Sequence, residues 1–278
     1  MKNLVHFNEN SLSIYTKALD KKQDNDMKTR LSAVLANITN AYSQYDDAFG
    51  LNRLENLVAN PLFTPHKNDL SGLYKFTSAT VRNLKEAIDK LQPFALGNTC
   101  QNCTINSVNS MDHVLGQAGF PEYCVHPLNL FPSCIECNGY KSASFVRNGN
   151  RRFLNLYCDT LPDVQYLFLQ VFTNANGDLD YSFEVRNTNG LSDNLFGLIS
   201  SHYSELRLFK RMKDQSIKYY NELRNTVQSR LDDVSWDVVT RQVRKEALDN
   251  MNNLGLNHFQ YVLNIAMVES PLFRASFE

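Results

Sequence analysis

Two Cys-x2-Cys pairs constrain the fold of this chain more than any other feature of its sequence. Thirty residues lie between the pairs, and two such pairs are typical of a site where four thiolates hold one zinc ion. The predicted ligands are Cys100, Cys103, Cys134 and Cys137. A four-thiolate site ties two short loops together and leaves no coordination position open, so its zinc is structural. Any chemistry in this region must come from other side chains.

The alternative for these four cysteines is that they are unligated thiols in a protein core. The paired spacing disfavours that interpretation, and it also favours metal binding in a reducing cytosol over disulfides. Cys124 and Cys158 remain outside the pairs. We expect both of them to be small, buried apolar residues.

Polar residues suited to catalysis lie within and just beyond the zinc-bracketed stretch. Asp112 offers a hard oxygen ligand, and the adjacent His113 carries an imidazole that titrates near neutral pH. Asn129 and Asn138 follow in the same small region. Because a zinc clip needs only its cysteines, this set indicates a catalytic site. The alternative is that these four residues are polar residues without a catalytic role, in an interaction module that zinc holds together.

A short helix is expected to start near the second cysteine pair. Ser133 and Glu136 have the spacing of a capping box, in which the serine caps the helix. On such a helix Asn138 and Lys141 share a face, and its N-terminus would favour a phosphate nearby. The segment 138–152 holds four basic residues and no acid: Lys141, Arg147, Arg151 and Arg152. We interpret them as phosphate-positioning residues; the alternative is a solvated charged surface.

Length and charge limit the possible functions. With 278 residues the chain can bury a substantial core, so zinc need not hold the whole fold together. The formal net charge of −1 excludes a protein that coats nucleic acid through a broad basic surface. The first residues lack the apolar run of a signal peptide, and no apolar stretch is long enough to span a membrane. We therefore expect a soluble, cytoplasmic protein with no membrane partner.

The pattern along the chain predicts three regions. Residues 1–95 are expected to be helical, with one amphipathic helix running through 31–42 and another over 81–91. Residues 96–160 form the motif region, and 161–278 hold a β-hairpin followed by helices. The hairpin is predicted from two β-rich runs, 166–172 and 180–185, around an Asn-Gly turn. Further helices are expected over 206–231, 236–251 and 258–268.

The motif region resembles the HNH nucleases, also called the ββα-metal family. The stretch that carries the resemblance runs from Cys100 to about Ala143. The resemblance implies that Asp112 and Asn138 bind a catalytic Mg²⁺ or Mn²⁺ and that His113 activates a water. It also implies that Asn129 fixes the hairpin and the base. Cysteine pairs bracketing the core are common in that family.

A narrower resemblance concerns the HNH subunits of Septu-type anti-phage systems, which pair with an ATPase. It is carried by DH, FPEY and HPLNLFPSCIECNGYKS in this sequence. Such proteins often have Pro-Lys-Ser a few residues after DH, where this chain has Gly116 to Gly119. That departure leaves the implied metal ligands intact. The substrate contacts that the resemblance would imply for residues 116–119 do not carry over to this chain.

Together these observations predict an α+β, mostly helical protein. Helical N- and C-terminal segments would surround a zinc-bracketed ββα-metal core with an added hairpin. The expected function is metal-dependent cleavage of nucleic acid, DNA favoured, in anti-phage defence, with an ATPase as the expected protein partner. The alternatives are a nuclease for RNA or tRNA and a catalytically idle zinc-binding module.

Overall fold

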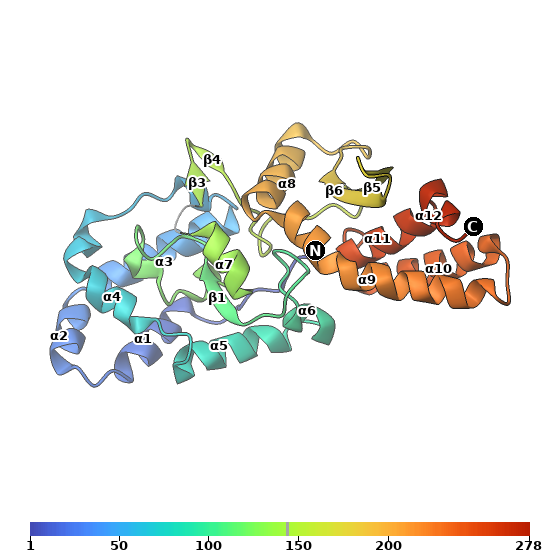
Figure 1. The fold of residues 1–278 in the computed structure, drawn as a ribbon. Helices are drawn as coiled ribbons and strands as arrows, with labels where there is room; N and C mark the ends of the chain where they lie inside the picture. The colour runs from blue at the N-terminus through green and yellow to red at the C-terminus, as the bar shows by residue number, and fades with distance from the viewer. Residues whose placement is uncertain (143–144) are drawn as a thin grey trace. The chain divides into compact units, whose positions relative to one another are not determined.

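The computed structural model of the chain describes residues 1–142 and 145–278. Ala143, the last residue of the stretch that carries the resemblance, lies outside the described residues. The described chain divides into two compact units, one of residues 3–102 and 106–160 and one of 161–278 with 1–2 and 103–105. The expected α+β, mostly helical class is confirmed (Figure 1). The division into 1–95, 96–160 and 161–278 stays a prediction.

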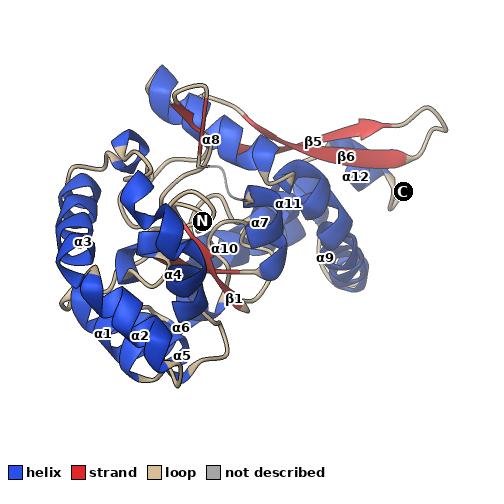
Figure 2. Cartoon of the chain, turned by 90° about the vertical axis from the view of Figure 1, so that its left-hand side faces the viewer, coloured by secondary structure: helices blue, strands red, loops and turns tan. Residues whose placement is uncertain are grey.

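Six helices open the first unit and lie around its central strand pair (Figure 2). They are α1 (Ser11–Asp20), α2 (Asn25–Ala33), α3 (Leu35–Gly50), α4 (Lys67–Leu73), α5 (Ala79–Lys90) and α6 (Phe94–Asn98). Side-chain caps fix several starts: Asn10, Asp24 and Ser78 each accept a hydrogen bond from a backbone N–H of the first turn. The predicted helix over 81–91 is confirmed as α5.

The expectation of one continuous helix through 31–42 is wrong. Helix α2 ends at Ala33 and α3 begins at Leu35, with Val34 between them outside helical geometry. Leu31 and Ile38 are fully buried, whereas Leu35 is 39% exposed. The apolar stripe is therefore shared by two helices, and periodicity alone did not reveal the break.

A two-stranded antiparallel pair and a short helix form the centre of the first unit. Strand β1 (Ser110–His113) pairs with β2 (Leu130–Ser133), with Ser110 opposite Ser133 and His113 opposite Leu130. Helix α7 (Ile135–Lys141) follows β2 and packs on β1. Both strands are buried along their whole length.

Short elements complete this unit. Strands β3 (Val146–Arg147) and β4 (Asn150–Arg151) form a second antiparallel pair. The 3₁₀ helices are η1 (Leu54–Asn56), η2 (Pro61–His66), η3 (Pro121–Tyr123) and η4 (Pro127–Asn129). Helices η3 and η4 lie in the long connection between β1 and β2, so that connection is a structured loop.

The second unit begins with the predicted hairpin, which is confirmed. Strands β5 (Leu167–Thr173) and β6 (Leu179–Val185) are antiparallel, with Leu167 opposite Val185. Gly177 has a φ of 85°, which glycine adopts without strain. The Asn174 side chain accepts hydrogen bonds from the backbone of Asn176 and Asp178. The turn chemistry is local, which is why the sequence could predict it.

Helices make up the rest of the second unit. They are α8 (Asp193–Glu205), α9 (Leu208–Leu231), α10 (Trp236–Leu254), α11 (Phe259–Val268) and α12 (Pro271–Ala275). Three of them match the predicted helices, except that Leu206 lies in the turn before α9, where Arg207 is left-handed with a φ of 54°. Among the described residues, no helix combines the length and the apolar character needed to cross a membrane.

Candidate functional site

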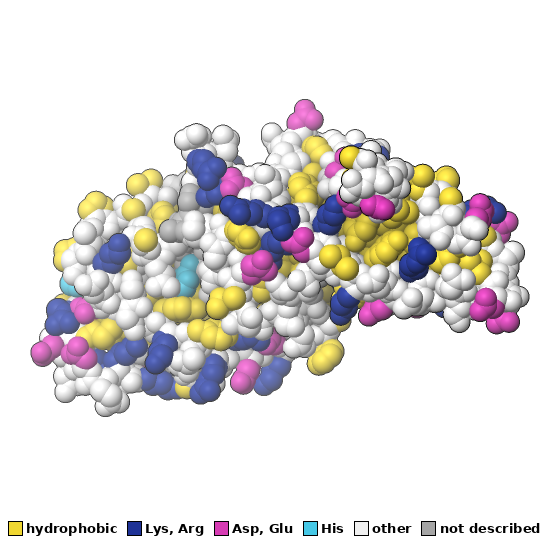
Figure 3. Space-filling view, in the orientation of Figure 1, with side chains coloured by type: hydrophobic (Ala, Val, Ile, Leu, Met, Phe, Trp, Pro, Cys, Tyr) yellow, Lys and Arg dark blue, Asp and Glu magenta, His cyan; other side chains and the backbone are white. Residues whose placement is uncertain are grey.

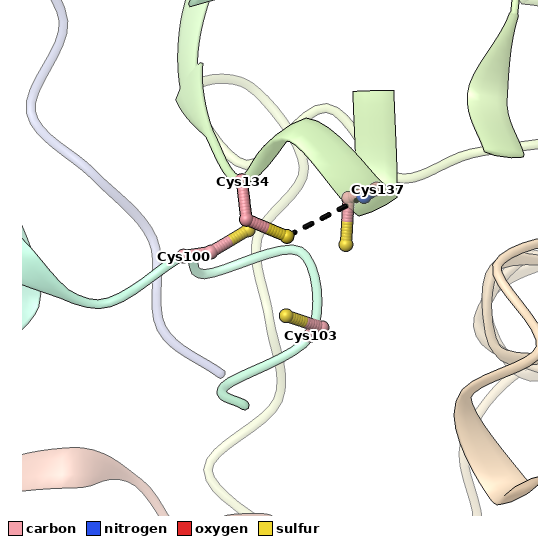
Figure 4. Close-up of side chains that lie close together, drawn as sticks. All are labelled: Cys100, Cys103, Cys134 and Cys137. Atoms are coloured by element: carbon pink, nitrogen blue, oxygen red, sulfur yellow. Dashed lines mark hydrogen bonds between the residues drawn. The ribbon is translucent and has the colours of Figure 1, made fainter. Parts of the chain in front are cut away.

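The four paired cysteines come together as predicted. All four are buried, and their sulfur atoms lie within 4.8 Å of one another (Figure 4). Zn–S bonds of about 2.3 Å in a tetrahedron place the sulfurs ~3.8 Å apart, so a small contraction would form the site. No other metal-ligating group of this kind occurs in residues 1–142 and 145–278. The donor set fits one structural zinc ion.

N–H groups are directed at two of the four sulfurs of this cluster. The Ile105 N–H donates to Cys103 Sγ and the Cys137 N–H donates to Cys134 Sγ. The nitrogen–sulfur distance is 3.4 Å in both bonds. The Asn106 side chain adds a longer donor to Cys134 at 3.8 Å. N–H groups directed at sulfur stabilise its negative charge and orient it for the metal. The other two cysteines lie elsewhere, Cys124 buried and Cys158 half-buried.

The predicted capping box at α7 is wrong. Cys134 is the N-cap residue, and its sulfur accepts the capping bond from Cys137. The Ser133 hydroxyl instead accepts a bond from Asn102 and lies 3.7 Å from Cys100 Sγ. Cys134 therefore occupies the N-cap position that the sequence pattern assigned to Ser133. The capping bond also gives the Cys134 sulfur an N–H donor.

Lys141 of α7 and Asp112 of β1 form a buried ion pair. Lys141 Nζ lies 3.2 Å from each carboxylate oxygen of Asp112, and it also donates to the backbone carbonyls of His113 and Val114. Burial raises the pKa of Asp112 above its ordinary value, and Lys141 opposes that shift. The predicted phosphate-positioning charge of Lys141 is thus directed inward in this structure.

His113 ends β1 with a defined tautomer. Its Nε2 lies 2.8 Å from the Cys124 carbonyl, which can only accept, so Nε2 carries the proton and Nδ1 keeps a lone pair. Burial lowers the pKa of His113 to about 4. The imidazole is therefore neutral at pH 7 and can accept a proton, but it does not titrate near neutral pH as expected from the sequence. A pKa this low makes it a weaker base than an imidazole with its ordinary pKa.

Two residues that sequence reasoning missed contact this imidazole. The Gln117 side-chain nitrogen lies 3.1 Å from His113 Nε2 and 3.2 Å from His113 Nδ1. The Tyr74 ring meets the imidazole edge to face at 4.5 Å, and the Tyr74 hydroxyl donates to the Met111 carbonyl. Gln117 falls where the chain departs from Pro-Lys-Ser, which was the available signal. Nothing local in the sequence points to Tyr74.

Asn129 closes the loop between β1 and β2. Its side chain accepts from the Leu115 N–H at 2.7 Å and donates to the carbonyls of Leu115 and Tyr123. Tyr45 of α3 donates to the same Asn129 oxygen at 3.1 Å. Since Tyr123 precedes Cys124, the carbonyl partner of His113, these contacts also fix the backbone that orients the imidazole.

Asn138 lies half-buried on α7, one turn before Lys141. Residues three apart share a helix face, and Lys141 reaches Asp112 from that face. The Asn138 amide makes no hydrogen bond to any described residue, so its oxygen is available to a ligand. A carboxylate and an amide oxygen suit a hard divalent cation, although Lys141 adds a competing positive charge at Asp112.

The three arginines in the expected basic patch have different surroundings. Arg151 is ion-paired with Asp159, and Arg152 is buried with its guanidinium 5.0 Å from the Phe153 ring centre. Arg147 is exposed on the β3–β4 hairpin. On the face drawn in Figure 3, the described Lys and Arg side chains form separate groups with Asp and Glu among them. The phosphate-positioning role stays a prediction.

His126 packs in the interior of the first unit. It is fully buried, and the rings of Tyr42 and Tyr45 lie 4.3 Å from its imidazole. Its ring also lies 3.3 Å from the Asp46 carboxylate. Burial lowers the pKa of His126. The His126 imidazole is completely enclosed, whereas the buried His113 keeps 8% of its surface exposed, so His113 is the better candidate for a base.

These residues can bind, orient and accept a proton. His113 Nδ1 can take a proton from a water once the Gln117 amide moves aside, while the Cys124 carbonyl keeps the ring in place. A divalent cation held by Asp112 and Asn138 would supply positive charge for a phosphate oxygen. The arrangement is therefore compatible with hydrolysis of a phosphodiester.

A stretch of 65 residues is similar to protein ea31 of Escherichia phage lambda, with 37% identity. The aligned part spans 23% of this chain and 22% of ea31, so the chain covers about a fifth of the length of that relative. No family model matches the chain. No solved structure matches it either.

Proposed function

We propose that this protein is a divalent-metal-dependent endonuclease of the HNH type that cleaves phosphodiester bonds, with DNA as the favoured substrate. The observation that carries the proposal is the order β1, β2, α7, with Asp112 and His113 closing β1 and Asn138 on α7. A neutral His113 with a fixed tautomer is consistent with a general base, whose contribution to rate is typically about 10²–10⁴-fold.

Anti-phage defence, with an ATPase as protein partner, belongs to the same proposal. It rests on the resemblance to Septu-type subunits and on charge. With a net charge of −1 and with Lys141 and Arg151 paired internally, the chain has little standing affinity for nucleic acid. A partner that delivers the substrate would make up for this weak affinity.

A catalytically idle zinc module is the second candidate. The buried pair between Lys141 and Asp112 favours it, because the carboxylate proposed to hold the catalytic cation already has a positive partner. This candidate predicts zinc binding and no cleavage.

A cleavage assay separates these candidates. Purified protein is incubated at low ionic strength, which offsets its weak affinity for nucleic acid, with plasmid, single-stranded DNA and total RNA in Mg²⁺, in Mn²⁺ or in EDTA. We expect cleavage of DNA that EDTA stops, and a higher metal requirement for Asn138→Ala. Cleavage confined to RNA would move the proposal to the RNA-cleaving alternative. Metal-independent cleavage, or none with any substrate, would refute it.

A further inference from the structure

A small apolar cavity adjoins the loop that follows His113. Its volume is about 220 Å³, and Leu115 and Gly116 of that loop form part of its wall. The apolar part of the lining comes from Leu54, Leu57, Phe120, Phe145 and Val146. Because Asn129 holds both backbone groups of Leu115, the cavity wall is fixed to the same framework as the candidate base.

Glu55 carries the only charge among the described residues that line the cavity. Its Oε2 atom is shielded from solvent and has no hydrogen-bond partner in the described chain. A buried acceptor left without a donor costs about 1–3 kcal/mol. A rotation of the Glu55 side chain that turns this oxygen into the cavity would let a ligand N–H group recover part of that cost. Glu55 thus distinguishes the cavity from a simple packing defect.

The size and chemistry of the cavity indicate its occupant. Pockets for drug-sized ligands measure about 300–1,000 Å³, so this cavity suits one planar ring system and not a whole nucleotide. Aromatic walls such as Phe120 and Phe145 bind nucleobases by stacking. A carboxylate accepts hydrogen bonds from an exocyclic amino group such as cytosine N4. Thymine and uracil lack that group.

The residues around the cavity suit a nucleotide whose nucleobase is inside the cavity and whose phosphate lies outside it. Arg147 is exposed and directly follows the lining residue Val146. The Arg151 guanidinium also lies 5.3 Å from the centre of the Phe145 ring, but Asp159 neutralises its charge. The positive charge of Arg147 next to the cavity would favour the backbone of a strand whose nucleobase is inserted.

We propose that this cavity receives an unstacked nucleobase with an exocyclic amino group, next to the phosphate to be cut, and that Glu55 selects it. The inference rests on the proposed function, because it places a nucleic acid at His113. Glu55 is a specificity-determining residue in this view, and Phe120 contributes stacking without selecting a base.

Binding of two matched oligonucleotides tests the selection. Fluorescence anisotropy compares oligodeoxycytidine with oligodeoxyuridine, whose bases differ at the amino group and the adjacent ring nitrogen. His113→Ala protein is used so that neither strand is cut. We expect oligodeoxycytidine to bind about 5- to 100-fold more tightly, as for a good base-edge contact. Adding Glu55→Gln should remove the preference, while Glu86→Gln on an exposed part of α5 should keep it.

Phe120→Leu, a second variant, should weaken both strands alike and leave their ratio unchanged. Equal affinity for the two strands, a preference that survives Glu55→Gln, or no measurable binding of either strand would overturn the inference. Cleavage assays with wild-type protein on mixed-sequence strands are run in parallel. Cutting without base preference would overturn the inference alone, whereas failure to cut with any metal would refute the proposed function.

Discussion

The buried pair of Asp112 and Lys141 gives the first prediction at the scale of single residues. Lys141→Met leaves the Asp112 carboxylate buried without its partner, which should lower the free energy of unfolding by about 3–5 kcal/mol. A divalent cation can then take over the lost positive charge. Mn²⁺ should therefore raise the melting temperature of this variant more than that of the wild type.

Lys210→Met is the matched control for Lys141→Met, because it removes the same group from a largely exposed ion pair with Asp214. Its effect on stability should stay within about 0.5 kcal/mol. Thermal unfolding with and without Mn²⁺ provides the measurement. Equal Mn²⁺ responses in wild type and Lys141→Met would show that Asp112 does not bind the cation.

Two tyrosines on α3 provide an internal comparison. The Tyr45 hydroxyl donates to Asn129, whereas the buried Tyr42 hydroxyl has no partner in the described chain. Tyr45→Phe should therefore cost about 1 kcal/mol of unfolding free energy, and Tyr42→Phe should cost nothing or stabilise. Urea unfolding of the two variants measures the difference. If both variants lost equal stability, the Tyr45 bond would not support the loop as inferred.

Glu122 gives a prediction on pH. It is buried, and burial raises its pKa to about 7 from an ordinary value of 4.5. The folded state thus holds the proton more tightly, so the stability from this group is complete below pH 4.5 and is lost as pH rises through 7. Glu122→Gln should be more stable than wild type at pH 8, by up to about 3 kcal/mol, and should lose that advantage near pH 4. Unfolding at both values measures this, and a gain that does not change with pH would contradict it.

At the scale of elements, α7 depends on the cysteine cluster for its start. Cys134→Ser separates capping from metal binding, because serine is a good N-cap but not a zinc ligand of this kind. We expect loss of zinc and local unfolding of α7 despite the retained cap. Elemental analysis and amide exchange measure the two effects. Cys158→Ser, outside the cluster, should keep zinc, and a stable, zinc-loaded Cys134→Ser protein would contradict the assignment.

Elements set by local chemistry could be predicted from the sequence, and those set by packing could not. The β5–β6 hairpin follows from its turn residues, and α5 from a single clear apolar stripe. The break between α2 and α3 left no local signal, because the apolar stripe continues across it from Leu31 to Ile38. Capping of α7 by Cys134 was missed for a related reason, since the cysteine cluster forms only in the folded chain.

At the scale of the whole molecule, distant segments support the candidate site. Tyr45 and Asn129 are 84 residues apart, and Tyr74 reaches Met111 across 37 residues. The motif residues Asp112, His113, Asn129 and Asn138 could be chosen from the sequence because they lie close together in it. Their distant partners Tyr45 and Tyr74 required the fold. The helical N-terminal region therefore helps to hold the candidate site in place through Tyr45 and Tyr74.

The rate of phosphodiester cleavage with and without His113 tests the central claim most directly. Wild type and His113→Ala are compared on the same DNA under single-turnover conditions with Mn²⁺, after zinc content and thermal stability have been matched. The predicted result is a rate lower by about 10²–10⁴-fold in His113→Ala, with zinc and fold retained. An unchanged rate in that variant would contradict the account.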